Sequence, residues 1–146
     1  MPNVALNLTG TISGSTLSDT SGNYQFSSLP AGGSYTVTPT KAALLPASPG
    51  ISTVDVIATQ RHFLNLVLLP PGCRLAAADA NGDTAVDTVD VVAIQRFFLG
   101  LSTGTANVGK YQFNPANRAY PTMVNDQIDQ SYGALIFGDV VTPFVQ

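Results

Sequence analysis

The sequence has few of the residues on which most catalytic and metal-binding chemistry depends. Its 146 residues include one cysteine, Cys73, one histidine, His62, no tryptophan and no glutamate. A single cysteine excludes a disulfide framework within one chain, so we expect Cys73 to be a small hydrophobic residue. One histidine without glutamate leaves no metalloprotease motif and no zinc-binding pair. We therefore expect a protein that is not an enzyme, in which His62 has a packing or surface role.

Charged residues are also scarce. They make up 10% of the chain, against roughly 25% in an average soluble protein. The six Lys and Arg residues occur singly, so no basic stripe exists for nucleic acid or an anionic membrane. No apolar run reaches the ~18 residues of a membrane span. A weakly charged surface rich in Ser, Thr, Asn and Gly favours an extracellular or cell-surface location.

Alternating apolar and polar residues occur near both ends of the chain. In the first part this period of two predicts strands at 4–9, 24–27 and 35–38, separated by turns rich in Gly, Pro, Asp and Asn. In the last part the same reasoning predicts a loop at 114–122 and strands at 110–113, 134–137 and 140–141.

The middle of the chain has a helical period and contains a duplication. Residues 51–65 align with residues 86–100 at an offset of 35, and nine of the fifteen positions are identical. Apolar residues at helical spacing predict two helices, 53–64 and 88–99. Asn65 and Gly100 stand where left-handed C-terminal caps belong. Because neither helix can bury its apolar stripe alone, we expect the two to pack on each other.

Residues 79–90 carry the strongest chemical signal. Four of the nine acidic residues fall in this stretch, which leads directly into the second helix. Calcium takes six to eight oxygen ligands, and a twelve-residue loop supplies them from alternating positions. The predicted ligands, in chain order, are Asp79, Asn81, Asp83, the backbone carbonyl of Ala85, Asp87 and Asp90. The alternative is a solvated turn whose last acids only cap the helix.

This loop departs from the usual calcium loop at two positions. The sixth residue is Thr84 instead of glycine, although Gly82 lies two residues earlier. The last ligand is Asp90 instead of glutamate, so the loop has to close more tightly on the ion. Magnesium demands a rigid octahedron that keeps several waters, so calcium remains the predicted ion.

With its second loop and both helices, the duplicated region resembles a dockerin domain, a pair of calcium-loop-plus-helix repeats. Gln60-Arg61 and Gln95-Arg96 fit that pattern. The stretch 22–39 resembles the end of a Cna B-type or carboxypeptidase-regulatory-like β-sandwich. The resemblance implies a secreted prokaryotic surface module. It also implies cohesin-binding positions on the helix faces, which here would be Thr53, Val54, Arg61, Thr88, Val89 and Arg96.

The first repeat has lost part of this pattern. Leu44, Pro46 and Ser48 replace the first three ligands, and only Ser52 and Asp55 match the last two. One interpretation is that these two residues form a capping box on the first helix. The other is a second, rearranged calcium site.

In that second site Asp55 would combine with backbone carbonyls near Gly50 and with a remote acid. Asp139 is the best donor, ahead of Asp126 and Asp129. The sequence therefore predicts one calcium ion and leaves two open.

These patterns together predict an α+β fold that is mainly β. We expect a small antiparallel β-sandwich built from both chain ends, with an inserted pair of calcium-loop helices. The expected parts are 1–43 (Cna B-like), 44–105 (helical pair) and 106–146 (loop and closing strands). Two functions stay open: a structural subunit that assembles with copies of itself, through exposed strand edges, or an adaptor that binds a cohesin-like protein.

Overall fold

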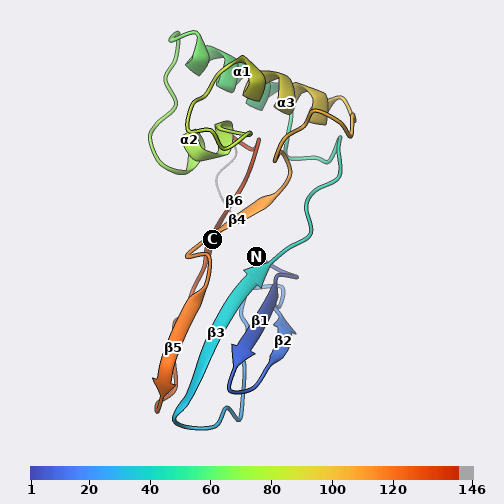
Figure 1. Cartoon of the computed structure of the whole chain (residues 1–146). Helices are drawn as coiled ribbons and strands as arrows, with labels where there is room; N and C mark the ends of the chain where they lie inside the picture. The colour runs from blue at the N-terminus through green and yellow to red at the C-terminus, as the bar shows by residue number, and fades with distance from the viewer. Residues whose placement is uncertain (142–146) are drawn as a thin grey trace. The chain divides into compact units, whose positions relative to one another are not determined.

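The computed structural model describes residues 1–141, which form an α+β fold of six strands and three helices. The chain divides into two compact units (Figure 1). The strand unit comprises Met1–Lys41 and Phe113–Ala134, and the helical unit comprises Ala42–Gln112 and the described residues after 134. Residues 44–105, predicted as the helical pair, lie inside the helical unit.

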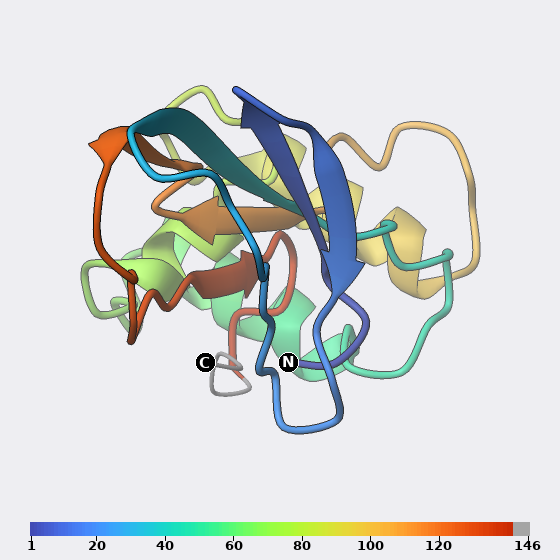
Figure 2. The same cartoon turned by 90° about the horizontal axis from the view of Figure 1, so that it is seen from below.

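The strand unit contains one antiparallel sheet to which both parts of the chain contribute. Its strands are β1 (Ala5–Gly10), β2 (Gly14–Leu17), β3 (Gly33–Thr40) and β5 (Arg118–Met123). Their order is β2-β1-β3-β5, and Figure 2 shows the β1–β2 hairpin in dark blue beside β3. The predicted sheet from both chain ends is thus confirmed.

One face of this sheet is apolar and forms the core of the strand unit. Leu6 and Leu8 on β1 and Tyr35 and Val37 on β3 are buried. Alternate residues of the same strands, such as Asn7, point to the other face, where the Asn7 amide donates a 3.1 Å hydrogen bond to the Thr40 hydroxyl. The period of two in the sequence therefore placed the core face correctly.

Loops cover this core face where a second sheet of a sandwich was expected. The strand predicted at 24–27 is wrong: its residues alternate between half-buried and exposed, as a strand does, but have no ladder partner. The loop predicted at 114–122 is also wrong, because β5 begins at Arg118 and pairs with β3. Pro121 lies within β5, an edge strand of the sheet, where proline is tolerated. The short, polar β2 was not predicted.

A separate two-stranded sheet is formed by β4 (Tyr111–Asn114) and β6 (Gly133–Ile136). Both strands were expected within a residue or two of these bounds. The strand predicted at 140–141 is wrong, because the N–H groups of Val140 and Val141 are bound to a side chain instead of a neighbouring strand.

The helical unit is built on the duplicated pair. The predicted helices are confirmed as α1 (Thr53–Phe63) and α3 (Thr88–Phe98), which pack on each other (Figure 1). Each starts with a capping box and ends in a residue of left-handed backbone, Asn65 with φ 55° and Gly100 with φ 79°. The short helix α2 (Cys73–Ala78) between them was not predicted as a helix. Ala78, Ile94 and Phe97 lie in the shared core.

The turn after β1 makes a prediction about the sheet. Gly10 has φ 126°, and a Cβ atom there would collide with the backbone carbonyl of Ser34. We expect Gly10→Ala to lower the free energy of unfolding by about 2 kcal/mol. Gly14→Ala is the matched control, because a Cβ at Gly14 meets no atom within 4 Å. Chemical denaturation of both variants measures the free energy of unfolding. Equal values would contradict the close approach of Gly10 to the Ser34 carbonyl.

Candidate functional site

The loop at residues 79–90 wraps around the carboxylate of Asp79. One oxygen of Asp79 accepts the N–H groups of Gly82 at 2.8 Å and Asp83 at 3.1 Å, and the other accepts that of Thr84 at 2.9 Å. The chain thus bends tightly around its first predicted ligand. Asn81 and Asp83 repeat the motif, since their side-chain oxygens accept the N–H groups of Asp83 and Ala85 at 2.9 Å. The pKa of Asp83 lies below its usual value, chiefly because of the Ala85 N–H and also because the Asn81 amide donates to its carboxylate at 2.7 Å.

The sixth residue of the loop, Thr84, has the backbone conformation of a glycine. Thr84 has φ 75°, in the left-handed region that a β-branched residue rarely adopts. Gly82 also has a left-handed backbone, with φ 80°. A threonine kept in this conformation indicates that the loop geometry is imposed by the contacts around Asp79 and not by local preference.

Asp90 closes the loop. Its side chain is fully buried, and one oxygen accepts the Asp87 N–H at 2.9 Å while the other accepts the Asn81 N–H at 3.1 Å. Burial raises the pKa of Asp90, and the nearby carboxylate of Asp79 raises it further. No Lys or Arg is among the groups that act on this pKa. The last predicted ligand is therefore a buried acid beside another acid.

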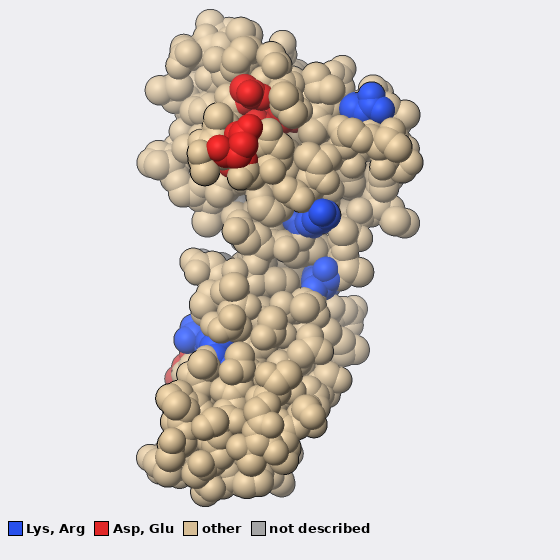
Figure 3. Space-filling model, viewed as in Figure 1, with Lys and Arg blue, Asp and Glu red and all other residues tan. Residues whose placement is uncertain are grey.

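All the predicted metal ligands in the loop are oxygen atoms. In residues 1–141 no three Asp, Glu, His or Cys side chains are gathered closely enough to hold a metal ion by themselves. The predicted calcium ligands include, besides the carboxylates, the amide oxygen of Asn81 and the backbone carbonyl of Ala85. Figure 3 shows acidic side chains in one cluster on the visible face of the helical unit, while basic side chains are scattered. Such a hard, anionic oxygen set fits calcium.

In the first repeat, Asp55 takes the place that Asp90 has in the second. It is 1% exposed, and one oxygen accepts the backbone and hydroxyl groups of Ser52 at 2.8 and 3.0 Å. The other oxygen accepts the N–H groups of Val140 and Val141, at 2.9 and 3.0 Å. Ser52 and Asp55 thus form the capping box that the sequence indicated. The carboxylate also attaches a distant segment of the chain to α1, which the sequence did not predict.

The other residues of the tentative second calcium site have different surroundings. Gly50 is exposed with φ 109°, and the Asp139 N–H donates to the Ile136 carbonyl in a turn. In the segment that replaces the first loop, Leu44 lies against the core and its N–H donates to the Gly109 carbonyl, whereas Leu45 is exposed. A second ion stays an untested prediction. The single histidine of the chain is not among these residues: the Nδ1 atom of His62 accepts the Leu69 N–H at 3.0 Å.

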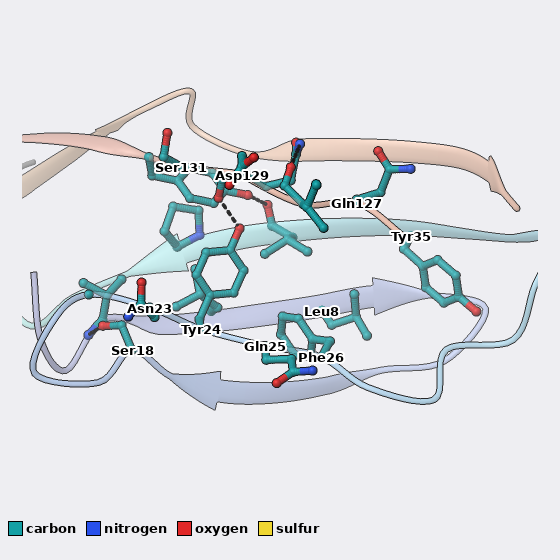
Figure 4. Close-up of a pocket in the computed structure, with 18 of the residues that line it drawn as sticks. Leu8, Ser18, Asn23, Tyr24, Gln25, Phe26, Tyr35, Gln127, Asp129 and Ser131 are labelled. Atoms are coloured by element: carbon teal, nitrogen blue, oxygen red, sulfur yellow. Dashed lines mark hydrogen bonds between the residues drawn. The ribbon is translucent and has the colours of Figure 1, made fainter. Parts of the chain in front are cut away.

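A second candidate site is a groove of about 1100 Å³ in the strand unit. Its floor is the apolar sheet face, and its two walls are the segments 21–29 and 126–132. Tyr24 extends from one wall toward the other (Figure 4), and its hydroxyl donates to the Gln130 carbonyl at 2.6 Å. The backbone groups of residues 24–29 make no hydrogen bond with other backbone groups in the described part of the chain. The sequence missed this groove because residues 24–27 read as an ordinary paired strand.

Comparison with known proteins adds no assignment. No protein-family model, no curated protein and no solved structure matches this chain. Among the described residues, no helix is long and apolar enough to cross a membrane. The function therefore has to be argued from the loop, the helices and the groove.

The Asp55 contact leads to a prediction about stability. In Asp55→Ala the N–H groups of Ser52, Val140 and Val141 lose their acceptor, so we expect the free energy of unfolding to fall by about 3 kcal/mol. Asp126→Ala removes an exposed acid and is expected to change it by less than about 0.5 kcal/mol. Urea titrations of both variants without calcium provide the measurement. Equal midpoints for Asp55→Ala and wild type would show that these hydrogen bonds do not stabilise the fold.

Proposed function

We propose that this chain is a non-catalytic, calcium-binding structural subunit of an extracellular or cell-surface assembly. In this proposal copies of the chain associate by β-strand addition, and calcium stabilises the helical unit. The observation that carries it is the groove of the strand unit, one wall of which, residues 24–29, makes no backbone hydrogen bond with the described part of the chain. The resemblance to dockerin and Cna B-type modules is consistent with this role.

Calcium binding is supported by the chemistry of residues 79–90. Burial and the nearby carboxylate of Asp79 raise the pKa of Asp90, although the N–H groups of Asp87 and Asn81 lower it, so a cation here would stabilise the charged carboxylate. A calcium ion would neutralise it and would join the N-terminal end of α3 to the end of α2. Because such an ion binds the folded loop and not the unfolded chain, its binding free energy becomes folding free energy.

Self-association is supported by the wall of the groove at residues 24–29. The apolar sheet face is already buried at Leu6, Leu8 and Val37, so the gain from an added strand lies in backbone pairing. Residues 24–29 make no backbone hydrogen bond with the described part of the chain, and an added strand would pair these groups. Few charged residues are present to block such pairing.

Calcium binding can be measured directly. We expect calcium at a hundredfold excess over its Kd to stabilise the wild-type protein by about 2.7 kcal/mol, which raises Tm by several degrees. Asp79→Ala should remove this gain, because Asp79 orders the loop and is its first ligand. Asp19→Ala, outside both predicted calcium sites, should keep it. Titration calorimetry without heat of binding in the wild type would refute the calcium proposal.

Assembly is tested by electron microscopy and size-exclusion chromatography of the isolated protein, with and without EDTA. We expect polymers or large oligomers in calcium, and fewer of them after EDTA. A stable monomer in calcium would contradict self-association. Assemblies equally abundant after EDTA would leave self-association intact and remove the role of calcium in it.

One observation favours a second candidate, an adaptor that binds a cohesin-like protein. The two repeat helices pack on each other and still expose equivalent apolar positions: Val54 with Val89, Ile57 with Val92 and Leu64 with Leu99. Thr53, Arg61 and Thr88 are exposed beside them, whereas Arg96 is half-buried and donates to the Thr103 carbonyl. A monomer that captures a cohesin domain, and loses it in a Val54→Asp/Val89→Asp variant, would support this function over self-assembly.

A further inference from the structure

We propose that Asn107, in the segment that follows α3, is a positioning residue of the calcium site at residues 79–90. The inference rests on the proposed calcium binding and adds to it a part of the site that lies outside the loop. The Asn107 side chain is not a ligand in this proposal. It fixes the peptide group of Asn81, the third residue of the loop, and so sets the direction in which Asn81 presents its ligand oxygen.

The segment that carries Asn107, residues 105–110, is itself firmly held in the helical unit. Val108 is 5% exposed and belongs to the core of this unit. The Gly109 N–H donates to the Phe137 carbonyl at 2.9 Å, and the Gly109 carbonyl accepts the Leu44 N–H at 2.9 Å. A side chain on this segment therefore has a rigid support, which a positioning residue requires.

Asn107 holds the start of the calcium loop through two of its groups. Its backbone N–H donates to the Ala80 carbonyl at 3.0 Å, and its side-chain amide donates to the Asn81 carbonyl at 3.5 Å. Ala80 is completely buried and lies between the predicted ligands Asp79 and Asn81. Two consecutive carbonyls of the loop thus bond to one residue of another segment.

The backbone of Asn81 is held from two sides. Its N–H donates to the carboxylate of Asp90 at 3.1 Å, within the loop, and its carbonyl accepts the Asn107 amide from outside the loop. With both groups bound, the direction of the Asn81 side chain is restricted before an ion arrives. Groups that orient a metal ligand in this way raise metal affinity, and their removal typically costs about 10- to 100-fold.

Lys110 determines which way the Asn107 amide faces. The Nζ atom of Lys110 donates to the Oδ1 atom of Asn107 at 3.1 Å. An ammonium group has donors only, so the amide oxygen faces Lys110 and the amide nitrogen faces the Asn81 carbonyl. The reverse orientation would place donor against donor at Lys110 and oxygen against oxygen at Asn81. The chemistry of both neighbours therefore assigns the amide as a donor to the loop.

The duplication provides an internal comparison. At the offset of 35 that relates the repeats, the first repeat has Gly72 and Leu75 where the second has Asn107 and Lys110. Neither glycine nor leucine has a side chain that can donate a hydrogen bond. The first repeat, which also lacks three of the predicted ligands, nevertheless forms its capped helix. The support is thus found beside the loop that keeps its ligands, and a capped repeat helix does not require it.

Asn107→Asp tests this role, because aspartate has the size of asparagine but no side-chain N–H. By charge alone, an added carboxylate near the loop would attract calcium and lower its Kd. We expect instead a Kd about tenfold higher in titration calorimetry, since the Asn81 carbonyl loses its donor. Asn117→Ala removes an exposed amide in the strand unit and should change the Kd by less than about twofold.

Two further measurements separate positioning from a purely structural role, which would lower the stability of the calcium-free protein and leave the Kd unchanged. Because the side-chain bond to Asn81 is long, we expect the Tm of calcium-free Asn107→Asp to fall by less than about 2 °C. Hydrogen exchange gives the local readout. Without calcium, the N–H groups of Gly82 and Thr84, which donate to Asp79, should exchange faster in the variant, while those of α1 should not change.

The outcomes distinguish this inference from the proposed function. If the wild-type protein binds calcium and Asn107→Asp has an equal or lower Kd, the role of Asn107 is overturned and the calcium site stands. A Kd that rises only together with a large fall in Tm assigns Asn107 to the fold and also overturns its positioning role. A wild-type protein that does not bind calcium overturns both.

Discussion

The helical unit depends on a buried aspartate at the same position of each repeat. Asp55 and Asp90 both stand at the third residue of a helix, both accept the N–H of the capping residue, and both are almost completely inaccessible to water. A carboxylate in such a place requires hydrogen-bond donors or a cation. The two repeats differ in the groups that bond to this aspartate.

In the first repeat the donors come from the chain itself. The N–H groups of Val140 and Val141 occupy one oxygen of Asp55, as the Asn81 N–H occupies one oxygen of Asp90. The first repeat has Leu44, Pro46 and Ser48 at the positions of three predicted ligands of the second repeat, and a remote segment bonds to its aspartate instead. The second repeat keeps its loop, and its aspartate lies beside another acid. The same buried residue therefore serves as a chain clamp in one copy and as the last predicted calcium ligand in the other.

The sequence was informative where one local pattern determines the structure. Both capped helices, the main strands and the wrapped loop followed from period, duplication and turn residues. Residues 24–27 show why other features were missed. An alternating pattern indicates that every second side chain is buried, and this pattern is the same whether or not a neighbouring strand pairs with the segment. The Asp55 clamp joins residues more than eighty positions apart, and no local signal in Val140 or Val141 indicates it. The sequence around Pro121 likewise did not indicate β5, because a proline fits in a strand only when that strand lies at a sheet edge.

The two copies of the duplicated unit have diverged in opposite directions. The first has Leu44, Pro46 and Ser48 where the second has the predicted ligands Asp79, Asn81 and Asp83, and it carries Leu66-Val67-Leu68 after its cap where the second carries Leu101-Ser102-Thr103. Backbone N–H groups of a remote segment bond to Asp55 in the first repeat, whereas Asp90 in the second lies beside the carboxylate of Asp79. Under the proposed function, calcium would therefore stabilise the second repeat, while contacts within the chain stabilise the first.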